Sequence, residues 1–236
     1  MDWTKLTNDP LDQSTAHMIR EHLKGISKLY SRELVSYFCD IAKEKNTLHI
    51  GCYEHDEKYL NSEAWKHKSI NDVAKSCTGL DINKNGVEHM KSLGYDAVHA
   101  DATSEIDLGK LFDTIIAGDV IEHVDNISGL IRFSSKHLSA NGKLYLSTPN
   151  PFYIGHVLSA WTNRPTVANF EHTTWLSEST MLEVARRSGL TLEEIIYPIG
   201  NSYKSIFFRW AKKITFKFRS TMLFTTIVYR MAKKSH

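Results

Sequence analysis

Cysteine, proline, glycine and long apolar runs are all scarce in this chain. Its 236 residues include three cysteines, five prolines and twelve glycines. Cys39, Cys52 and Cys77 are widely spaced and form no CxxC pair, which argues against a disulfide framework or a zinc site and favours a reducing compartment. No stretch reaches the roughly 18 apolar residues of a membrane span, and the polar N-terminus lacks the apolar core of a signal peptide. We therefore expect a cytoplasmic protein.

An excess of one charge is also absent. Lys and Arg number 29 against 27 Asp and Glu, which gives a formal net charge of +2. The chain thus lacks the global positive field that dominates nucleic-acid binding, and we expect no nucleic-acid partner. An apolar content of 42% with 24% charged residues excludes disorder of the whole chain. The length suffices for one sizeable α/β domain.

Apolar periodicity predicts strands and helices in alternation. A helical segment is expected at about 12–45, either continuous or broken into two pieces at Gly25. Further helices are expected at about 59–76, 83–93, 127–138 and 177–187, with Asn83 as an N-cap. Strands are expected at 47–51, 77–82, 95–99, 111–117, 143–147, 190–197 and 223–229. Since parallel neighbours need long crossovers, this order predicts a mostly parallel sheet with helices on both faces.

We predict a single domain over residues 1–236. Its parts, in order, are an N-terminal helical extension (1–46), a core (47–199) with a lid (149–175), a basic amphipathic insertion (200–220), and the last strand and tail (221–236).

Glycine and aspartate end the first four predicted strands, as Gly51, Asp81, Asp101 and Asp119. Ligands of open α/β sheets bind beyond the carboxyl ends of the strands, so these residues are expected at one site. Gly51 would let a ligand approach the backbone, and Asp81 could accept two hydrogen bonds from a ribose diol. Three carboxylates suit a cationic nucleoside better than a pyrophosphate. Together with the absence of GxGxxG, this disfavours a dinucleotide-dependent oxidoreductase.

These segments together resemble class I S-adenosylmethionine (SAM)-dependent methyltransferases, in particular the group with an Asp-x-x-Glu-His segment after the fourth strand. The resemblance covers roughly residues 47–233 and is carried by Leu48–Cys52, Gly79–Ile82, Ala100–Ala102, Phe112–Val124, Leu138–Asn150 and Glu171-His172. It implies a Rossmann-like, seven-stranded, mostly parallel sheet whose one antiparallel strand, the seventh, lies beside the fifth. It also implies SAM as cofactor, S-adenosylhomocysteine (SAH) as product, and no metal.

The resemblance further implies a set of cofactor contacts. The backbone of residues 51–53 would face the methionine part, Asp81 the ribose and Ile82 the adenine, while residues 101–102 would lie at the adenine edge and 118–120 beside the sulfonium. With His55 of the first loop, the implied set is Gly51, Cys52, Tyr53, His55, Asp81, Ile82, Asp101, Ala102, Gly118, Asp119 and Val120. The Tyr53–Asp56 loop departs from the glycine-rich pattern of the family, which keeps open a binding protein without turnover.

Methyl transfer from a sulfonium depends mostly on the alignment of two reactants, but a hydroxyl acceptor also needs a base. The candidates are His123 and His172, with Glu122 to orient or assist. Aromatic residues of the lid fit a sugar or an apolar ring system, and the alternative is that they pack the lid onto the core: Phe152, Tyr153, Trp161, Phe170 and Trp175.

The insertion at 200–220 holds six basic residues and no acid, with apolar residues at helical spacing. This pattern is typical of a helix on an anionic membrane surface. The alternative is packing on the domain itself or on a second subunit of a homodimer. Together with the aromatic lid, it favours O-methylation of a glycan or lipid-linked saccharide at the inner face of the membrane, in polysaccharide biosynthesis. The alternative acceptor is a quinone-like molecule or another small metabolite.

Overall fold

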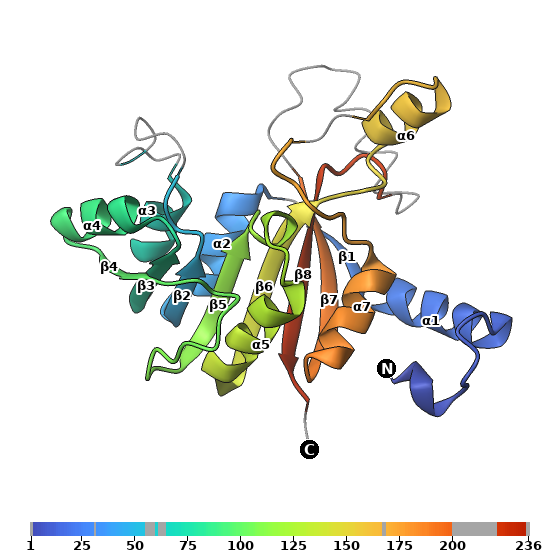
Figure 1. Cartoon of the computed structure of the whole chain (residues 1–236), viewed down its shortest axis with the longest axis horizontal. Helices are drawn as coiled ribbons and strands as arrows, with labels where there is room; N and C mark the ends of the chain where they lie inside the picture. Colours follow the sequence, from blue (N-terminus) through green and yellow to red (C-terminus); the bar gives the residue numbers. More distant parts are fainter. Residues whose placement is uncertain are drawn as a thin grey trace.

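An eight-stranded sheet runs through the described part of the chain, in the order β1-β7-β8-β6-β5-β2-β3-β4 (Figure 1). The computed structural model describes residues 2–30, 32–54, 60, 65–166, 169–199 and 221–234. The strands are β1 (Ser27–Tyr30), β2 (Asn46–Ile50), β3 (Ser76–Asp81), β4 (Asp96–His99), β5 (Phe112–Gly118), β6 (Leu138–Pro149), β7 (Leu190–Pro198) and β8 (Thr226–Lys233).

Neighbouring strands are parallel except at β8, which is antiparallel to both β6 and β7. All seven predicted strands are present, and the antiparallel one lies beside the fifth, as the resemblance implies. The central strands β2 and β5 are almost wholly buried, as is usual for the centre of a parallel sheet with helices on both faces.

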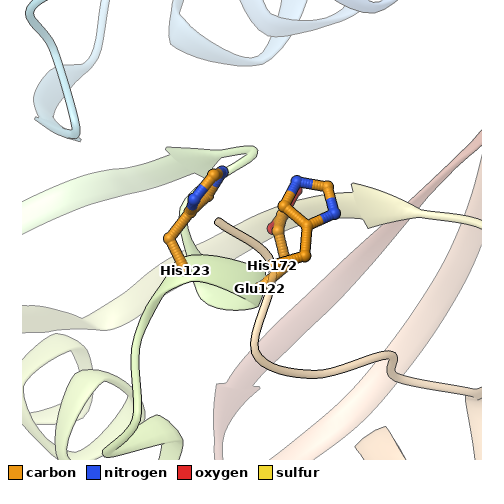
Figure 2. A group of neighbouring side chains, drawn as sticks. All are labelled: Glu122, His123 and His172. Carbon is orange, nitrogen blue, oxygen red and sulfur yellow. The ribbon is translucent and has the colours of Figure 1, made fainter. Parts of the chain in front are cut away.

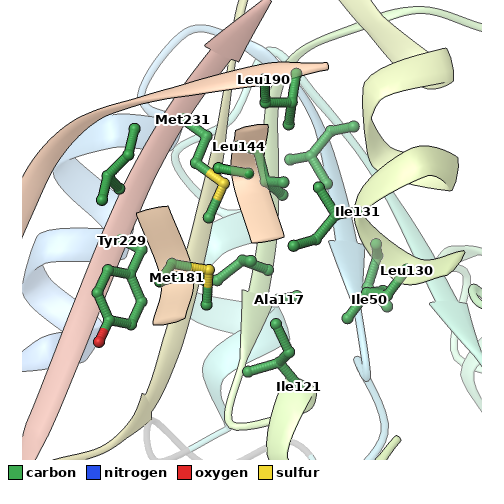
Figure 3. Packing of buried hydrophobic residues seen from close by; sticks show 14 of the residues in the cluster. Ile50, Ala117, Ile121, Leu130, Ile131, Leu144, Met181, Leu190, Tyr229 and Met231 are labelled. Carbon is green, nitrogen blue, oxygen red and sulfur yellow. The ribbon is translucent and has the colours of Figure 1, made fainter. Parts of the chain in front are cut away.

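Helices cover both faces of the sheet. They are α1 (Gln13–Ile26), α2 (Leu34–Ala42), α3 (Lys66–Asn71), α4 (Lys84–Ser92), α5 (Ile127–His137), α6 (Ile154–Trp161) and α7 (Glu178–Arg187), with the 3₁₀ turns η1 (Trp3–Lys5) and η3 (Ile121–His123). Leu130 and Ile131 of α5 and Met181 of α7 pack on one face (Figure 3). A second buried cluster joins Phe38 of α2 to Ile116 of β5.

Side-chain caps fix where several helices begin. The Asn83 side chain accepts a hydrogen bond from the Gly86 backbone N–H at 3.0 Å, which confirms the predicted cap of α4. Asn126 and Ser177 cap α5 and α7 in the same way. Each cap satisfies an N–H group that the helix itself leaves without a partner.

Three sequence predictions need correction. The N-terminal segment is not continuously helical, because β1 separates α1 from α2 and pairs with β7, with Ser27 opposite Ile195. The last strand lies at 226–233 rather than 223–229. The lid region at 149–175, for which the sequence analysis predicts no helix, contains α6, whose large apolar residues Ile154, Val157, Leu158 and Trp161 recur at three- and four-residue steps.

The basic insertion at 200–220 lies outside the described residues, so the structure leaves that prediction untested. Within the described part of the chain, no helix has both the length and the apolar character to cross a membrane.

Candidate cofactor and acceptor site

A cavity of about 390 Å³ opens beyond the carboxyl ends of β2, β3 and β5. The chain runs from β2 to β3 on one side and from β5 to β6 on the other, so the order of strands reverses there. Such a crevice is the usual ligand site of this architecture. Its lining residues are Gly51, Tyr53, Glu54, Asp81, Ile82, Asn83, Asp119, Val120, His123 and Glu171.

Gly51 forms the floor of this cavity and cannot easily be any other residue. Its φ of +70° lies in the left-handed region, and a Cβ built on it would come within 2.4 Å of Val120 Cγ2. Its N–H donates to the Leu80 carbonyl at 2.8 Å, which ties the turn to β3. The backbone is therefore held open to close approach by a ligand.

Asp81 presents a carboxylate whose position is fixed by the backbone. Oδ2 accepts a hydrogen bond from the Tyr53 N–H and Oδ1 accepts one from the Asn83 N–H, both at 2.9 Å. Each oxygen retains a further lone pair, enough for the two hydroxyls of a ribose. The neighbouring Ile82 is 70% exposed, an apolar surface at the cavity edge against which a flat base can pack.

Asp119 ends β5 with a φ of +58°, which is unusual for a residue other than glycine. Its N–H donates to the Ser147 hydroxyl at 3.0 Å, and that hydroxyl donates to Asp119 Oδ1 at 2.9 Å. Oδ2 accepts a hydrogen bond from Lys66 Nζ, also at 2.9 Å. Burial disfavours the Lys66 ammonium, but the facing carboxylate outweighs it and raises the pKa of Lys66. The strained conformation is thus held from two sides, as is common where a residue serves a ligand.

The cavity is strongly acidic. Glu54, Asp81, Asp119 and Glu171 line it, and its described lining includes neither Lys nor Arg. A crevice with one sign of charge concentrates ligands of the opposite sign. This arrangement suits the sulfonium and amino groups of SAM, and it agrees with the expectation of a cationic nucleoside.

Glu122, His123 and His172 lie close together (Figure 2), and His123 also lines the cavity. The His123 and His172 rings meet edge to face with their centroids 4.7 Å apart. Glu122 Oε1 lies 4.0 Å from His172 Nε2, and His123 Nδ1 lies 4.0 Å from Glu171 Oε2. Two segments about 50 residues apart are held together here, because Thr173 donates from its N–H (2.8 Å) and its hydroxyl (3.2 Å) to the Glu122 carbonyl.

Glu122 is the most deeply buried member of this group, with 1% of its surface exposed. Within the described part of the chain, neither of its carboxyl oxygens has a hydrogen-bond partner, and the same holds for His172 Nδ1. Burial raises the pKa of Glu122 to about 7, and the negative charge of Asp119 acts in the same direction, against the opposing effects of the backbone, the Thr148 hydroxyl and the Lys66 ammonium. Near neutral pH this carboxyl is therefore divided between its neutral and ionised forms.

The structure brings most of the implied site residues together but not all of them. Gly51, Tyr53, Asp81, Ile82, Asp119, Val120 and His123 line the cavity, with Glu122 and His172 next to it. Their individual roles stay predictions.

Four other residues of the implied set lie away from the lining of this cavity. The Cys52 thiol is buried 3.5 Å from the Met90 sulfur, and Gly118 packs against Phe38. The Asp101 carboxylate accepts hydrogen bonds from the N–H and hydroxyl of Thr103 at 2.7 and 2.8 Å, and Ala102 is buried in the core. His55 lies outside the described residues.

Lys66, which lies outside the cavity lining but pairs with Asp119, was missed by the sequence analysis. It begins α3, a short helix that follows a polar stretch without motif, so no local pattern distinguishes it from other surface lysines. Glu54, Asn83 and Glu171 also join the lining, and each directly neighbours a residue of the predicted site or of its motifs.

A second pocket, of about 340 Å³, lies beside α6. It is mostly apolar and is lined by Pro151, His156, Val157, Ala160, Thr166 and Trp175. The His156 and Trp175 rings lie 4.6 Å apart. Glu171 lines the cofactor cavity, and Trp175, four residues later, lines the second pocket. Four residues span at most about 14 Å, so the two pockets have lining residues within that distance of each other.

The sheet is mostly parallel, has one antiparallel strand, and changes strand order at an acidic cavity. Gly51 and the strand-end Asp81 line that cavity. Together these features define a SAM-dependent methyltransferase. Residues 19–195 match a family model described as a methyltransferase domain, and the chain belongs to this family.

Two solved structures share the fold at low sequence identity. The TehB-like SAM-dependent methyltransferase of Corynebacterium glutamicum is 14% identical, with a TM-score of 0.54 over 94% of this chain and 97% of that one. The N-methyltransferase NodS of Bradyrhizobium japonicum, solved with SAH, is 14% identical, with a TM-score of 0.53 over 98% and 91%. Among curated proteins, the ubiquinone biosynthesis O-methyltransferase of Rickettsia conorii is 33% identical over 78 residues, which span 31% of this chain and 27% of that protein.

Proposed function

We propose that this methyltransferase transfers the methyl group of SAM to a hydroxyl oxygen of a small acceptor that contains an apolar ring. The observation that carries the proposal is the position of His123. Its side chain lines the acidic cofactor cavity and also contacts the His172 ring next to buried Glu122. An acceptor hydroxyl at this edge would meet both a methyl donor and groups able to take its proton.

The cavity residues divide the cofactor between them. Asp81 binds the ribose hydroxyls, and Ile82 packs on the adenine. Gly51 leaves room for the methionine chain. Lys66, which pairs with Asp119 next to the lining and uses one of its three N–H donors there, supplies a cation for the methionine carboxylate. When bound, SAM supplies an electrophilic methyl group on a positively charged sulfur.

The protein's own chemical task is to align the acceptor and remove its proton. A neutral imidazole of His123 or His172 can accept that proton near pH 7. Glu122 faces His172 Nε2 at 4.0 Å and stabilises the charged imidazole that results. Alignment supplies the larger share of the rate, because positioning two reactants removes most of the entropic cost of their encounter.

The pocket beside α6 supports an acceptor with an apolar ring. Of its lining side chains, those of His156 and Thr166 are the polar ones, whereas a saccharide presents many hydroxyls that each need a partner. The Rickettsia relative carries the name of a ubiquinone biosynthesis enzyme, which supports a quinone-like acceptor over the glycan favoured by the sequence analysis.

Contact with an anionic membrane remains part of the proposal. Helix α6 exposes 44% of Leu158 and 82% of Trp161. Its first residue, Ile154, donates its N–H to the Met222 carbonyl at 2.8 Å, two residues beyond the basic segment 200–220. An exposed apolar helix together with a basic amphipathic sequence is a combination typical of peripheral membrane proteins. A variant lacking 200–220 should lose the co-sedimentation with anionic liposomes that the intact chain shows at low salt.

Calorimetry with SAH, followed by a methyl-transfer assay with labelled SAM, tests the proposed function. We expect SAH to bind and label to enter phenolic or quinol acceptors rather than hydroxylated saccharides. His123→Gln and His172→Gln should retain SAH affinity while turnover falls by about 10²- to 10⁴-fold. Undiminished turnover in both variants would remove the assigned role of the two histidines, and SAH binding without turnover on any acceptor would favour the binding-protein alternative.

A further inference from the structure

The cluster of Glu122, His123 and His172 has the composition and spacing of a metal-binding group. One carboxylate oxygen and one ring nitrogen from each histidine all lie within 4.8 Å of one another. Two ligand atoms that are each about 2.1 Å from one ion are at most about 4.2 Å apart. Small side-chain rotations would therefore bring all three onto a common ion. Figure 2 shows the two imidazoles projecting to the same side of η3.

Two members of this cluster, Glu122 and His172, have polar atoms with fewer partners than burial normally demands. Glu122 is 1% exposed, yet neither carboxyl oxygen has a hydrogen bond of normal geometry in the described part of the chain, although the nearby Thr148 hydroxyl favours the carboxylate. His172 Nδ1 is also unpaired there. An unsatisfied buried polar group costs about 1–3 kcal/mol, and more when it is charged. A bound cation would supply the missing partner for the carboxylate.

We propose that Glu122, His123 and His172 bind one divalent transition-metal ion at the edge of the cofactor cavity. Two imidazoles and one carboxylate suit ions such as Mn²⁺, Fe²⁺, Co²⁺ or Zn²⁺ better than Ca²⁺ or Mg²⁺, which prefer oxygen ligands alone. Three protein ligands leave coordination positions open. Because His123 lines the cavity, an ion held by this cluster would lie at the edge of the space into which an acceptor would enter.

The consequence for the reaction rests on the proposed function. An acceptor hydroxyl bound to the ion would lose its proton to solvent more readily, since a divalent ion lowers the pKa of an oxygen that it binds. The oxygen–carbon bond then forms as the sulfur–carbon bond breaks, and the bonding pair returns to sulfur. In the metal-bound form the histidines hold the ion, so proton removal no longer needs a free imidazole.

The sequence alone does not reveal this group. Cysteine spacing argues against a zinc site, and the resemblance implies no metal. His172 joins the Glu122-His123 pair only through the folded segment that Thr173 ties to the Glu122 carbonyl.

Direct binding of metal alone to the full chain tests the inference. The protein is stripped with EDTA and titrated with Mn²⁺, followed by electron paramagnetic resonance, and with Zn²⁺, followed by calorimetry. We expect one ion per chain, with Glu122→Gln and His172→Ala each weakening the affinity at least about tenfold. His123→Ala is a further variant that folding tolerates more easily, because that side chain is 26% exposed.

Two control variants test whether the ion is instead held by the negative charge of the cavity or by an exposed histidine elsewhere on the surface. Glu54→Gln removes a carboxylate of the same cavity outside the cluster, and His17→Ala removes an exposed histidine of α1. Both should bind the ions as tightly as the wild type. If Glu54→Gln weakens binding as much as Glu122→Gln, the ion is held by the acidic field alone and the inference fails.

SAH affinity, measured in EDTA, distinguishes this inference from the proposed function. Variants that keep wild-type SAH affinity are folded at the site, so their loss of metal affinity supports ligation. Wild-type protein that binds SAH but holds neither ion more tightly than Glu122→Gln overturns the metal site and leaves the methyltransferase proposal intact. Wild-type protein that binds metal but not SAH would support the metal site and contradict the methyltransferase proposal.

Discussion

Mild acid should destabilise the fold through a pair of histidines behind the cofactor cavity. His49 of β2 and His67 of α3 stack with ring centroids 5.4 Å apart and their Nδ1 atoms 3.2 Å apart. They are 1% and 0% exposed, and neither Nε2 has a hydrogen-bond partner in the described part of the chain. One Nδ1 must accept the hydrogen bond that the other donates, so the pair cannot be doubly protonated without losing it.

The sign and size of the effect follow from proton linkage. Burial lowers the pKa of His67 from 6.5 to about 4, against the opposing attraction of the Asp96 carboxylate. Burial also lowers the pKa of His49, and the nearby positive charges of His67 and Lys66 act in the same direction. The unfolded chain therefore binds more protons below pH 6.5, so stability is complete above that pH and is lost as the pH falls towards 4. For His67 alone the loss between pH 7 and pH 5 is about 2 kcal/mol.

Urea unfolding at the two pH values measures this loss. His67→Phe keeps a ring against Trp65 and Tyr95, whose centroids lie 5.5 and 5.4 Å from that of His67, but it cannot titrate. Between pH 7 and pH 5, the free energy of unfolding should fall in both proteins, but the fall should be about 2 kcal/mol smaller in His67→Phe than in the wild type. His17→Gln, an exchange at an exposed position, should behave as the wild type does. Equal pH dependence of wild type and His67→Phe would refute the reasoning.

Further predictions concern the cavity and its supports. Gly51→Ala should weaken SAH binding and lower stability by at least about 1–2 kcal/mol, the cost of a left-handed L-residue. Gly189→Ala, at φ +76° with open space around it, should lose stability but keep SAH affinity; equal SAH affinity in both variants contradicts the assignment of Gly51. Lys66→Met should reduce SAH affinity about tenfold in calorimetry, because Asp119 loses its cation. Lys110→Met, which breaks an exposed ion pair with Asp96, should leave SAH affinity unchanged. Asn150→Ala should lower the thermal midpoint, because the buried Asn150 amide donates to the carbonyls of Thr221 and Phe224 at 3.0 and 2.8 Å, and an unchanged midpoint would contradict that role.

The sequence predicts the strands of the sheet centre because they carry their own signals. Buried parallel strands such as 47–51 and 111–117 are short, largely apolar runs with a glycine at or directly after their ends, and the Asn83 cap is a local motif. Strand β1 carries no such signal. Its four residues continue a helical spacing of apolar side chains, and they become a strand through pairing with β7, far along the chain.

The site residues also fall into those that the sequence predicts and those that it does not. Gly51, Asp81 and Asp119 could be placed from the sequence because strand ends meet at one edge of the sheet. His123 and His172 could be proposed only as alternatives, since about 50 residues separate them and their ring contact depends on the path of the lid. Lys66 could not be found, because its function derives from an ion pair with Asp119 that only the folded chain creates.

The place of β8 in the sheet has a consequence for biosynthesis. In the described sheet, β1 and β7 join the remaining strands solely through β8, which follows all of them along the chain. During synthesis, β1 and β7 therefore cannot dock beside β6 until residues 226–233 have been made. A nascent or truncated chain that ends before residue 226 keeps an unfilled gap beside β6, so its sheet stays in two parts.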